Sequence, residues 1–298
     1  MIRPSHVAAL LLLLGLSGCA STIHPLQLPN PRALPPTEFS HAGLDRVLER
    51  FVDEDGLVDY AALGREPFVL GTYLGQLAAY SPVSHPALFA NSNARLAYWL
   101  NAYNAVALRL VLEHYPITSV RDIEAWWTAA LPEGAGFFYG YRFPLGGRST
   151  SLYTLENRIV RRGFPDPRIH FALNCASLGC PVLPRQAFDP ARLDEQLAHE
   201  TRRFLSAARN FRLDEATRTA WLSAIFDGYE GDFTKWQSRR GGDASLLAFV
   251  ADHAGPEAAA AAARAATEGF TVRFHEHDWR LNDQALGPRP ASEASLRP

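Results

Sequence analysis

The feature that most constrains the fold is a long helical segment from Ser92 to His114. Its apolar residues recur at the spacing of one face of an α-helix. Ser92 or Asn93 can cap its beginning, and Pro116 ends the helical pattern. A helix must bury such a stripe, so we expect a globular domain built around this segment. The stripe consists of Leu96, Trp99, Leu100, Tyr103, Val106 and Leu110.

Other helices are predicted on both sides of this segment from apolar periodicity and capping residues. The stretch 117–147 contains many aromatic residues interrupted by glycine and proline, which indicates short strands and loops. Arg168–Leu173 is predicted as a buried strand. We therefore expect an α+β fold, a single domain of several helices packed on a small, mainly antiparallel sheet. The other predicted helices cover residues 44–51, 67–79, 151–161, 190–206, 245–253 and 256–267.

Composition excludes two broad classes of protein. Apolar residues make up 47% of the chain, which is ample for a hydrophobic core and excludes a chain disordered throughout. The formal charge is only −2, and no cluster of lysine and arginine lies beside aromatic residues. We therefore expect no nucleic-acid partner.

The N-terminus carries a short apolar run, Val7–Leu16, preceded by Arg3. The run is shorter than the about 20 apolar residues that span a bilayer, so residues 1–18 are predicted to be a signal peptide. The residues that follow, Leu16-Ser17-Gly18-Cys19, resemble a bacterial lipobox, in which the cysteine thiol receives a diacylglycerol group. Cys19 is therefore the predicted lipidation site and mature N-terminus.

A lipid on Cys19 makes the membrane a partner of this protein, held through buried acyl chains on the periplasmic side. Ala20 follows the cysteine, and by resemblance to Gram-negative sorting patterns this favours the outer membrane. Residues 19–40, rich in proline, are predicted to be a linker, and residues 41–286 the folded domain. The tail 287–298 lacks apolar periodicity and is predicted to be disordered.

Several motifs of the domain together resemble a bacterial family known as domain-of-unknown-function family 547. The resemblance names a domain but implies no activity. This chain departs from the family pattern at Asn157, where we expect a histidine after the glutamate, and at His277, where we expect a tyrosine. The motifs are Asp55–Tyr60, Tyr98–Ala105, Ser151–Glu156, His170–Pro181, Ile225–Phe233 and Asp278–Asn282.

The loop between Cys175 and Cys180 is the strongest candidate for chemistry. In one interpretation Cys175 is a thiolate nucleophile whose pKa is lowered by His170 or by loop amides. Asn101 and Glu156 would then orient the histidine or bind an oxyanion. This hypothesis makes the protein a cysteine-dependent hydrolase or acyltransferase. A remote likeness to papain or transglutaminase is conceivable, although those folds place the nucleophile where this chain has Asn101.

Three other interpretations of the same loop stay open. Cys175 and Cys180 could form a disulfide in an oxidising compartment, within a non-catalytic binding or scaffold module. They could bind a soft metal ion together with His170, but no fourth ligand is evident, so no metal or other cofactor is expected. They could also be reduced cysteines that pack in the core. The ligand of such a module would be an unidentified small molecule or envelope component.

Other polar residues have structural interpretations as well. Asn101 could anchor the backbone of a neighbouring loop, because a buried amide must be paired. Glu156 could pair with an arginine such as Arg158 or Arg185. His275 and His277 point to one face of a predicted strand, but the sequence supplies no third metal ligand beside them.

Overall fold

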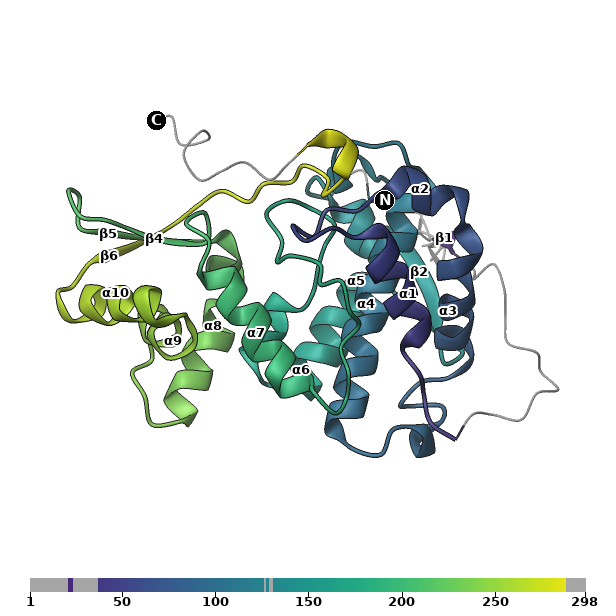
Figure 1. Cartoon of the computed structure of the whole chain (residues 1–298), viewed down its shortest axis with the longest axis horizontal. Helices are drawn as coiled ribbons and strands as arrows, with labels where there is room; N and C mark the ends of the chain where they lie inside the picture. Colours follow the sequence, from purple (N-terminus) through teal and green to yellow (C-terminus); the bar gives the residue numbers. More distant parts are fainter. Residues whose placement is uncertain (1–20, 24–36, 126, 129–130, 288–298) are drawn as a thin grey trace, which may run out of the picture.

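The computed structural model covers most of the predicted domain (Figure 1). The predicted signal peptide, the lipidation site Cys19 and the tail after Gly287 lie outside the described residues. Within the described part, none of the helices combines the length and the apolar character that crossing a bilayer requires. The described residues are 21–23, 37–125, 127–128 and 131–287.

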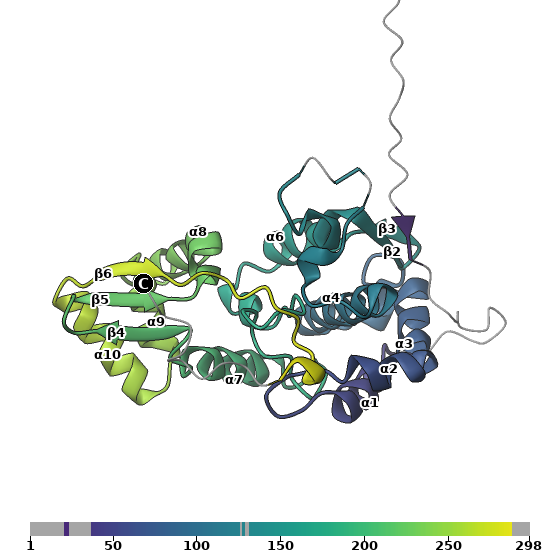
Figure 2. The same ribbon diagram turned by 90° about the horizontal axis from the view of Figure 1, so that it is seen from above.

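Two lobes with separate hydrophobic cores make up the described chain (Figures 1 and 2). The first lobe is built around α4 (Ser92–His114), whose bounds agree with the predicted segment. Asn91, not Ser92 or Asn93, caps this helix, because its side chain accepts the N–H of Ala94. Other helices of this lobe are α1 (Ala42–Phe51) and α3 (Pro67–Ala79), which lie close to their predicted bounds, and α2 (Tyr60–Arg65), which was not predicted.

The second lobe buries a cluster of phenylalanines under four helices and a sheet. Phe226 and Phe233 of α8 meet Phe249 of α9, with ring centroids between 4.7 and 6.3 Å apart. Helix α7 links the lobes, since Leu197 belongs to the first core and Phe204 to the second. These helices are α7 (Leu193–Leu205), α8 (Ala224–Arg239), α9 (Leu246–His253) and α10 (Pro256–Thr267).

The α+β class is confirmed, although the strands are arranged differently from the expected single sheet. The described strands form two three-stranded sheets, and each contains one antiparallel and one parallel pair. In the second lobe the chain crosses through α8, α9 and α10 before its last strand, which allows parallel pairing. The strands are β1 (Ser21–Thr22), β2 (Tyr141–Leu145), β3 (Arg148–Thr150), β4 (Phe211–Asp214), β5 (Thr219–Leu222) and β6 (Thr271–Phe274).

Strand β1 lies in the part of the chain that was predicted to be a linker. It pairs with β2, and the N–H of Ile23 donates to the carbonyl of Arg142 at 2.8 Å. Ile23 also packs against the first core. A proline-rich composition does not prevent this, because β1 precedes the prolines and β2 offers it unpaired backbone groups.

The predicted strand Arg168–Leu173 is wrong, because the chain forms a short 3₁₀ helix there, η5 (Pro167–Phe171). The carboxylate of Asp166 accepts the N–H of Arg168, and proline occupies the first helical position. Ile169 enters the first core and Phe171 the second. His170, between them, therefore lies where the two lobes meet.

Residues 278–282 return from the second lobe to the first and pair with the cysteine loop, as the yellow segment of Figure 1 shows. The N–H of Leu178 donates to the carbonyl of Arg280 at 2.8 Å, and the N–H of Asn282 donates to the carbonyl of Ala176 at 3.1 Å. Asn282 is fully buried, and its side-chain carbonyl accepts the hydroxyl of Tyr60 at 2.8 Å. Hydrogen bonds of this segment therefore join the C-terminal part of the domain to its N-terminal part.

We expect Asn282→Ala to lower the free energy of unfolding by about 1–3 kcal/mol, because it leaves the buried hydroxyl of Tyr60 without its acceptor. Urea unfolding measures this difference. Asn93→Ala, at an exposed position on α4, is the control and should change stability by less than about 0.5 kcal/mol. Equal effects of the two substitutions would show that the segment does not hold the domain together.

Candidate functional site

A cavity of about 220 Å³ lies where the two lobes meet. Its walls bring together Glu156, His170, Cys175 and Cys180, which come from distant parts of the sequence. These include three of the four predicted catalytic residues and both members of the predicted disulfide. Most of the remaining walls are aromatic or aliphatic, and the aromatic side chains are Tyr103, Phe138, Tyr229 and Trp279.

Glu156 forms an acidic group at one end of the cavity. It lies on η4 (Leu155–Val160), a π-helical turn that interrupts the predicted helix between α5 (Leu152–Thr154) and α6 (Arg161–Gly163). Such turns are frequent at functional sites. Glu156 is only 6% exposed, and its carboxylate accepts hydrogen bonds from the hydroxyls of Tyr229 and Tyr103, rather than pairing with Arg158 or Arg185 as the sequence suggested.

The two tyrosines hold the Glu156 carboxylate in place. Burial, and then the neighbouring Glu156, raise the pKa of Tyr103 and of Tyr229 well above the ordinary value. Both phenols therefore stay protonated and donate to the carboxylate. Tyr229 departs from helical geometry within α8, with φ −129° and ψ 20°. This kink and the π-helical turn meet at the Glu156–Tyr229 contact.

His170 is oriented by Asp232 of α8. Its Nε2 lies 2.9 Å from Oδ2 of Asp232, and Nε of Arg161 donates to the same oxygen at 2.7 Å. Burial alone would raise the pKa of Asp232, but the hydrogen bonds from His170 and Arg161 outweigh it and hold the pKa well below its usual range. The ionised carboxylate can only accept, so Nε2 carries a proton and donates. The ring of His170 also stacks on Tyr229, with centroids 4.0 Å apart.

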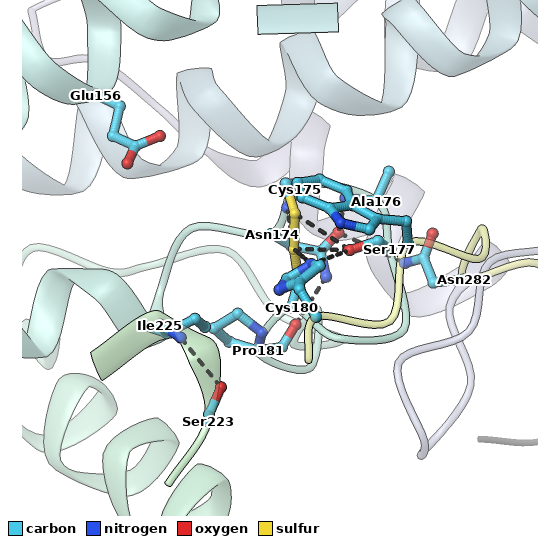
Figure 3. Close-up of a disulfide and its surroundings, with 12 residues drawn as sticks. Glu156, Asn174, Cys175, Ala176, Ser177, Cys180, Pro181, Ser223, Ile225 and Asn282 are labelled. Carbon is cyan, nitrogen blue, oxygen red and sulfur yellow. Dashed lines mark hydrogen bonds between the residues drawn. A yellow bond between two sulfur atoms is a disulfide. The ribbon is translucent and has the colours of Figure 1, made fainter. Parts of the chain in front are cut away.

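Cys175 and Cys180 form a disulfide, which confirms that prediction (Figure 3). Their Cα atoms are 6.0 Å apart. The side chain of Asn174 holds both ends of the loop, because it accepts the N–H of Ala176 at 2.9 Å and donates to the carbonyl of Pro181 at 2.7 Å. Cys175 is 9% exposed and Cys180 is 3% exposed. In this state Cys175 carries no thiolate, so nucleophilic chemistry would require reduction.

The histidine beside the cysteines is His277 rather than the predicted His170. Its Nε2 lies 2.8 Å from Oγ of Ser177 and 4.0 Å from Sγ of Cys180. Burial lowers the pKa of His277 to about 4, against a smaller opposing effect of Asp278. The signals in the sequence were Ser177 inside the cysteine loop and His277, where we expect a tyrosine. The contact between the two residues joins positions 100 residues apart, so no local pattern predicts it.

Asn101 does not line this cavity in the described chain. Its side-chain amide donates to the carbonyl of Phe188 at 2.8 Å, and its oxygen accepts the N–H of the same residue at 2.9 Å. Asn101 thus anchors a loop backbone, as its structural interpretation predicted. This geometry gives it no contact with His170 or Cys175.

A larger and more open groove of about 870 Å³ lies beside α7. It is lined by charged side chains, but several of them pair with one another, such as Arg185 with Glu54 and Arg192 with Glu195. Burial raises the pKa of Glu200 in this groove to about 7, partly offset by Arg203. Charged side chains that already pair with one another are less available to bind a ligand. The cavity between the lobes is therefore the better candidate for a binding site.

In a comparison with known families, residues 88–205 match the model of a family described as "Protein of unknown function, DUF547". The match includes α4, Glu156 and the cysteine loop, and it supports the domain family that the motifs predict. The Asp55–Tyr60, Ile225–Phe233 and Asp278–Asn282 motifs lie outside the matched residues. The searches of curated proteins and of solved structures gave no match. The remote likeness to papain or transglutaminase therefore stays a prediction.

We expect iodoacetamide to modify neither Cys175 nor Cys180 in the oxidised protein and to modify both after reduction, because only free thiolates react. Peptide mass spectrometry measures the modification. In Cys180→Ser, Cys175 loses its partner and should react without reductant. Rapid modification of Cys175 in the unreduced wild-type protein would contradict the disulfide and would favour a nucleophile.

Proposed function

We propose that this protein is a lipid-anchored binding module of a bacterial cell envelope, and that the cavity between its lobes binds a small ligand. The observation that carries the proposal is the convergence of two fixed polar groups, Glu156 and His170, in a cavity with mainly aromatic and aliphatic walls. Small-molecule sites commonly combine apolar walls with a few oriented polar groups. The Cys175–Cys180 disulfide forms part of the cavity wall and has a structural role in this proposal.

The chemistry of the two polar groups indicates the class of ligand. Glu156 presents carboxylate oxygens that only accept hydrogen bonds when ionised. Nε2 of His170 is occupied by Asp232, which leaves Nδ1 as the ring atom for a ligand, an acceptor when the ring is neutral. The Glu156 carboxylate therefore favours a ligand that donates a hydrogen bond, such as an alcohol or an amine. The cavity is also smaller than the roughly 300–1,000 Å³ of sites for drug-sized molecules, so the ligand is small.

The polar groups are held before a ligand arrives. Glu156 is fixed by two phenols, and His170 by a hydrogen bond and a stacked ring. Side chains that are already ordered lose little conformational entropy on binding, which favours affinity in a small site.

A ligand-observed NMR screen of small alcohols and amines tests this proposal. Ala224, half-buried at the start of α8, lines the cavity, and we expect Ala224→Phe to fill it and weaken the best binder by more than about tenfold, or ~1.4 kcal/mol. Ala263→Phe, at an exposed position of α10, should bind as the wild-type protein does. If no compound binds the wild-type protein, or if Ala224→Phe binds equally well, the cavity is not a binding site.

The lipid anchor is the second part of the proposal and is supported by the sequence around Cys19. Cys19 and Ser21 are separated by one residue, so a lipid on Cys19 would lie within about 7 Å of the start of β1. Because β1 pairs with β2, this edge of the first lobe would face the membrane. The domain would then lie close to the bilayer, instead of at the end of a long stalk.

We expect Cys19→Ser to abolish labelling by a radioactive fatty acid and to release the protein from the membrane fraction of a Gram-negative host. The thiol is the acceptor of the acyl group, and a serine hydroxyl would not replace it. The Cys175→Ser Cys180→Ser double variant should keep the label. A Cys19→Ser protein that is still labelled would show that the lipid is attached elsewhere.

A cysteine-dependent hydrolase or acyltransferase is the second candidate function. It is favoured by the position of both sulfur atoms in the cavity wall, with Nε2 of His277 4.0 Å from Sγ of Cys180. Activity would then appear only in the reduced protein, and His277 would be the base in place of His170.

A further inference from the structure

Three potential metal ligands meet at the wall of the cavity. They are Sγ of Cys175, Sγ of Cys180 and Nε2 of His277, and all three atoms lie within 4.8 Å of one another. The cysteines come from one loop and the histidine from the segment that leads to residues 278–282. The N–H of Gly179 donates to the carbonyl of Asp278 at 2.8 Å, so backbone pairing places these donors together.

We propose that reduction of the Cys175–Cys180 disulfide creates a binding site for one Zn²⁺ ion. A dithiol reductant supplies two electrons and two protons, which break the S–S bond and leave two thiols, while the reductant itself becomes a disulfide. Zn²⁺ then binds both sulfurs as thiolates, and two protons are released. The disulfide and the metal site are alternative states of the same sulfur atoms.

The distances suit a zinc ion. With Zn–S bonds of about 2.3 Å and Zn–N bonds of about 2.0–2.1 Å, tetrahedral geometry requires a sulfur–nitrogen separation of roughly 3.6 Å. The separation between Sγ of Cys180 and Nε2 of His277 is 4.0 Å. After reduction the two sulfurs need to move to roughly 3.8 Å apart, which rotation of the Cys175 or Cys180 side chain provides.

The surroundings indicate an open metal site rather than a closed structural one. Cys175, Cys180 and His277 all line the cavity, so a fourth coordination position would face its interior and take water or a ligand. Oγ of Ser177 lies 3.3 Å from Sγ of Cys175 and 3.2 Å from Sγ of Cys180. The hydroxyl of Ser177 can donate a hydrogen bond to a thiolate ligand. Residues beside a metal site commonly orient the ligands through such hydrogen bonds.

The test compares zinc binding by the full-length protein, purified in detergent, in its oxidised and reduced states. Zinc content after dialysis is measured by elemental mass spectrometry, and affinity by competition with a chromophoric chelator. We expect one Zn²⁺ per reduced chain and none per oxidised chain. Addition of an oxidant should release the metal as the disulfide forms again. Cobalt bound to the reduced protein should show a thiolate-to-metal charge-transfer band.

Substitutions separate this site from unspecific binding. His277→Ala should weaken zinc binding by at least about tenfold, and Cys175→Ser should weaken it at least as much. His275→Ala is the matched control, since His275 lies two residues away but stacks on Trp221, with ring centroids 5.2 Å apart. It should bind zinc as the wild-type protein does.

Three results would overturn the proposal. They are a reduced protein that binds no zinc, equal affinity in His277→Ala and the wild-type protein, and a loss of affinity in His275→Ala as large as in His277→Ala. The proposal does not depend on the small-molecule site, because Ala224→Phe changes the interior of the cavity and leaves all three metal ligands in place.

Discussion

The backbone pairing between residues 278–282 and the cysteine loop is the interaction on which the rest of the structure depends. It joins the last segment of the described chain to the first lobe and carries His277 to the disulfide. The contact is close, since a Cβ atom on Gly179 would lie 2.7 Å from the backbone nitrogen of Asp278. Any larger residue at this position would push the two paired segments apart and displace His277 from the cavity wall.

Hydrogen bonds from buried amide side chains determine the conformation of the cysteine loop, which hydrophobic packing alone would not specify. The side-chain oxygen of Asn104 accepts the N–H of Asn174 at 2.9 Å, and the amide of Asn282 contacts the oxygen of Asn174 at 3.5 Å. Apolar contacts are not directional, whereas each of these hydrogen bonds requires one orientation of its partners. Because a buried amide without a partner is costly, the network favours one loop conformation over its alternatives. The same principle applies at the polar end of the cavity, where phenols and a carboxylate orient Glu156 and His170.

Local signals predicted much of the fold but little of the site. The bounds of α4 and α10 agree with prediction, because apolar periodicity and capping act over a few residues. At Asp166 and Pro167 a capping signal was present, but the apolar run after it favoured a strand. The pairing of His170 with Asp232 spans 62 residues, and that of Glu156 with Tyr229 spans 73. Neither pair has a local pattern, since the two lobes must pack before these side chains meet.

The sulfur atoms of Cys175 and Cys180 cannot serve as a disulfide, a nucleophile and a metal ligand at once, so the redox state decides which chemistry the cavity wall offers. The hydrogen bonds of the Asn174 side chain, which join the two ends of the loop, do not involve sulfur, whereas the N–H of Cys175 donates to Sγ of Cys180 at 3.2 Å. We expect the hydrogen bonds of Asn174 to persist when the disulfide is broken, because neither of them depends on sulfur, so the loop should keep its path on reduction. Under this proposal, the compartment in which the protein resides would control the site through the supply of reducing dithiols.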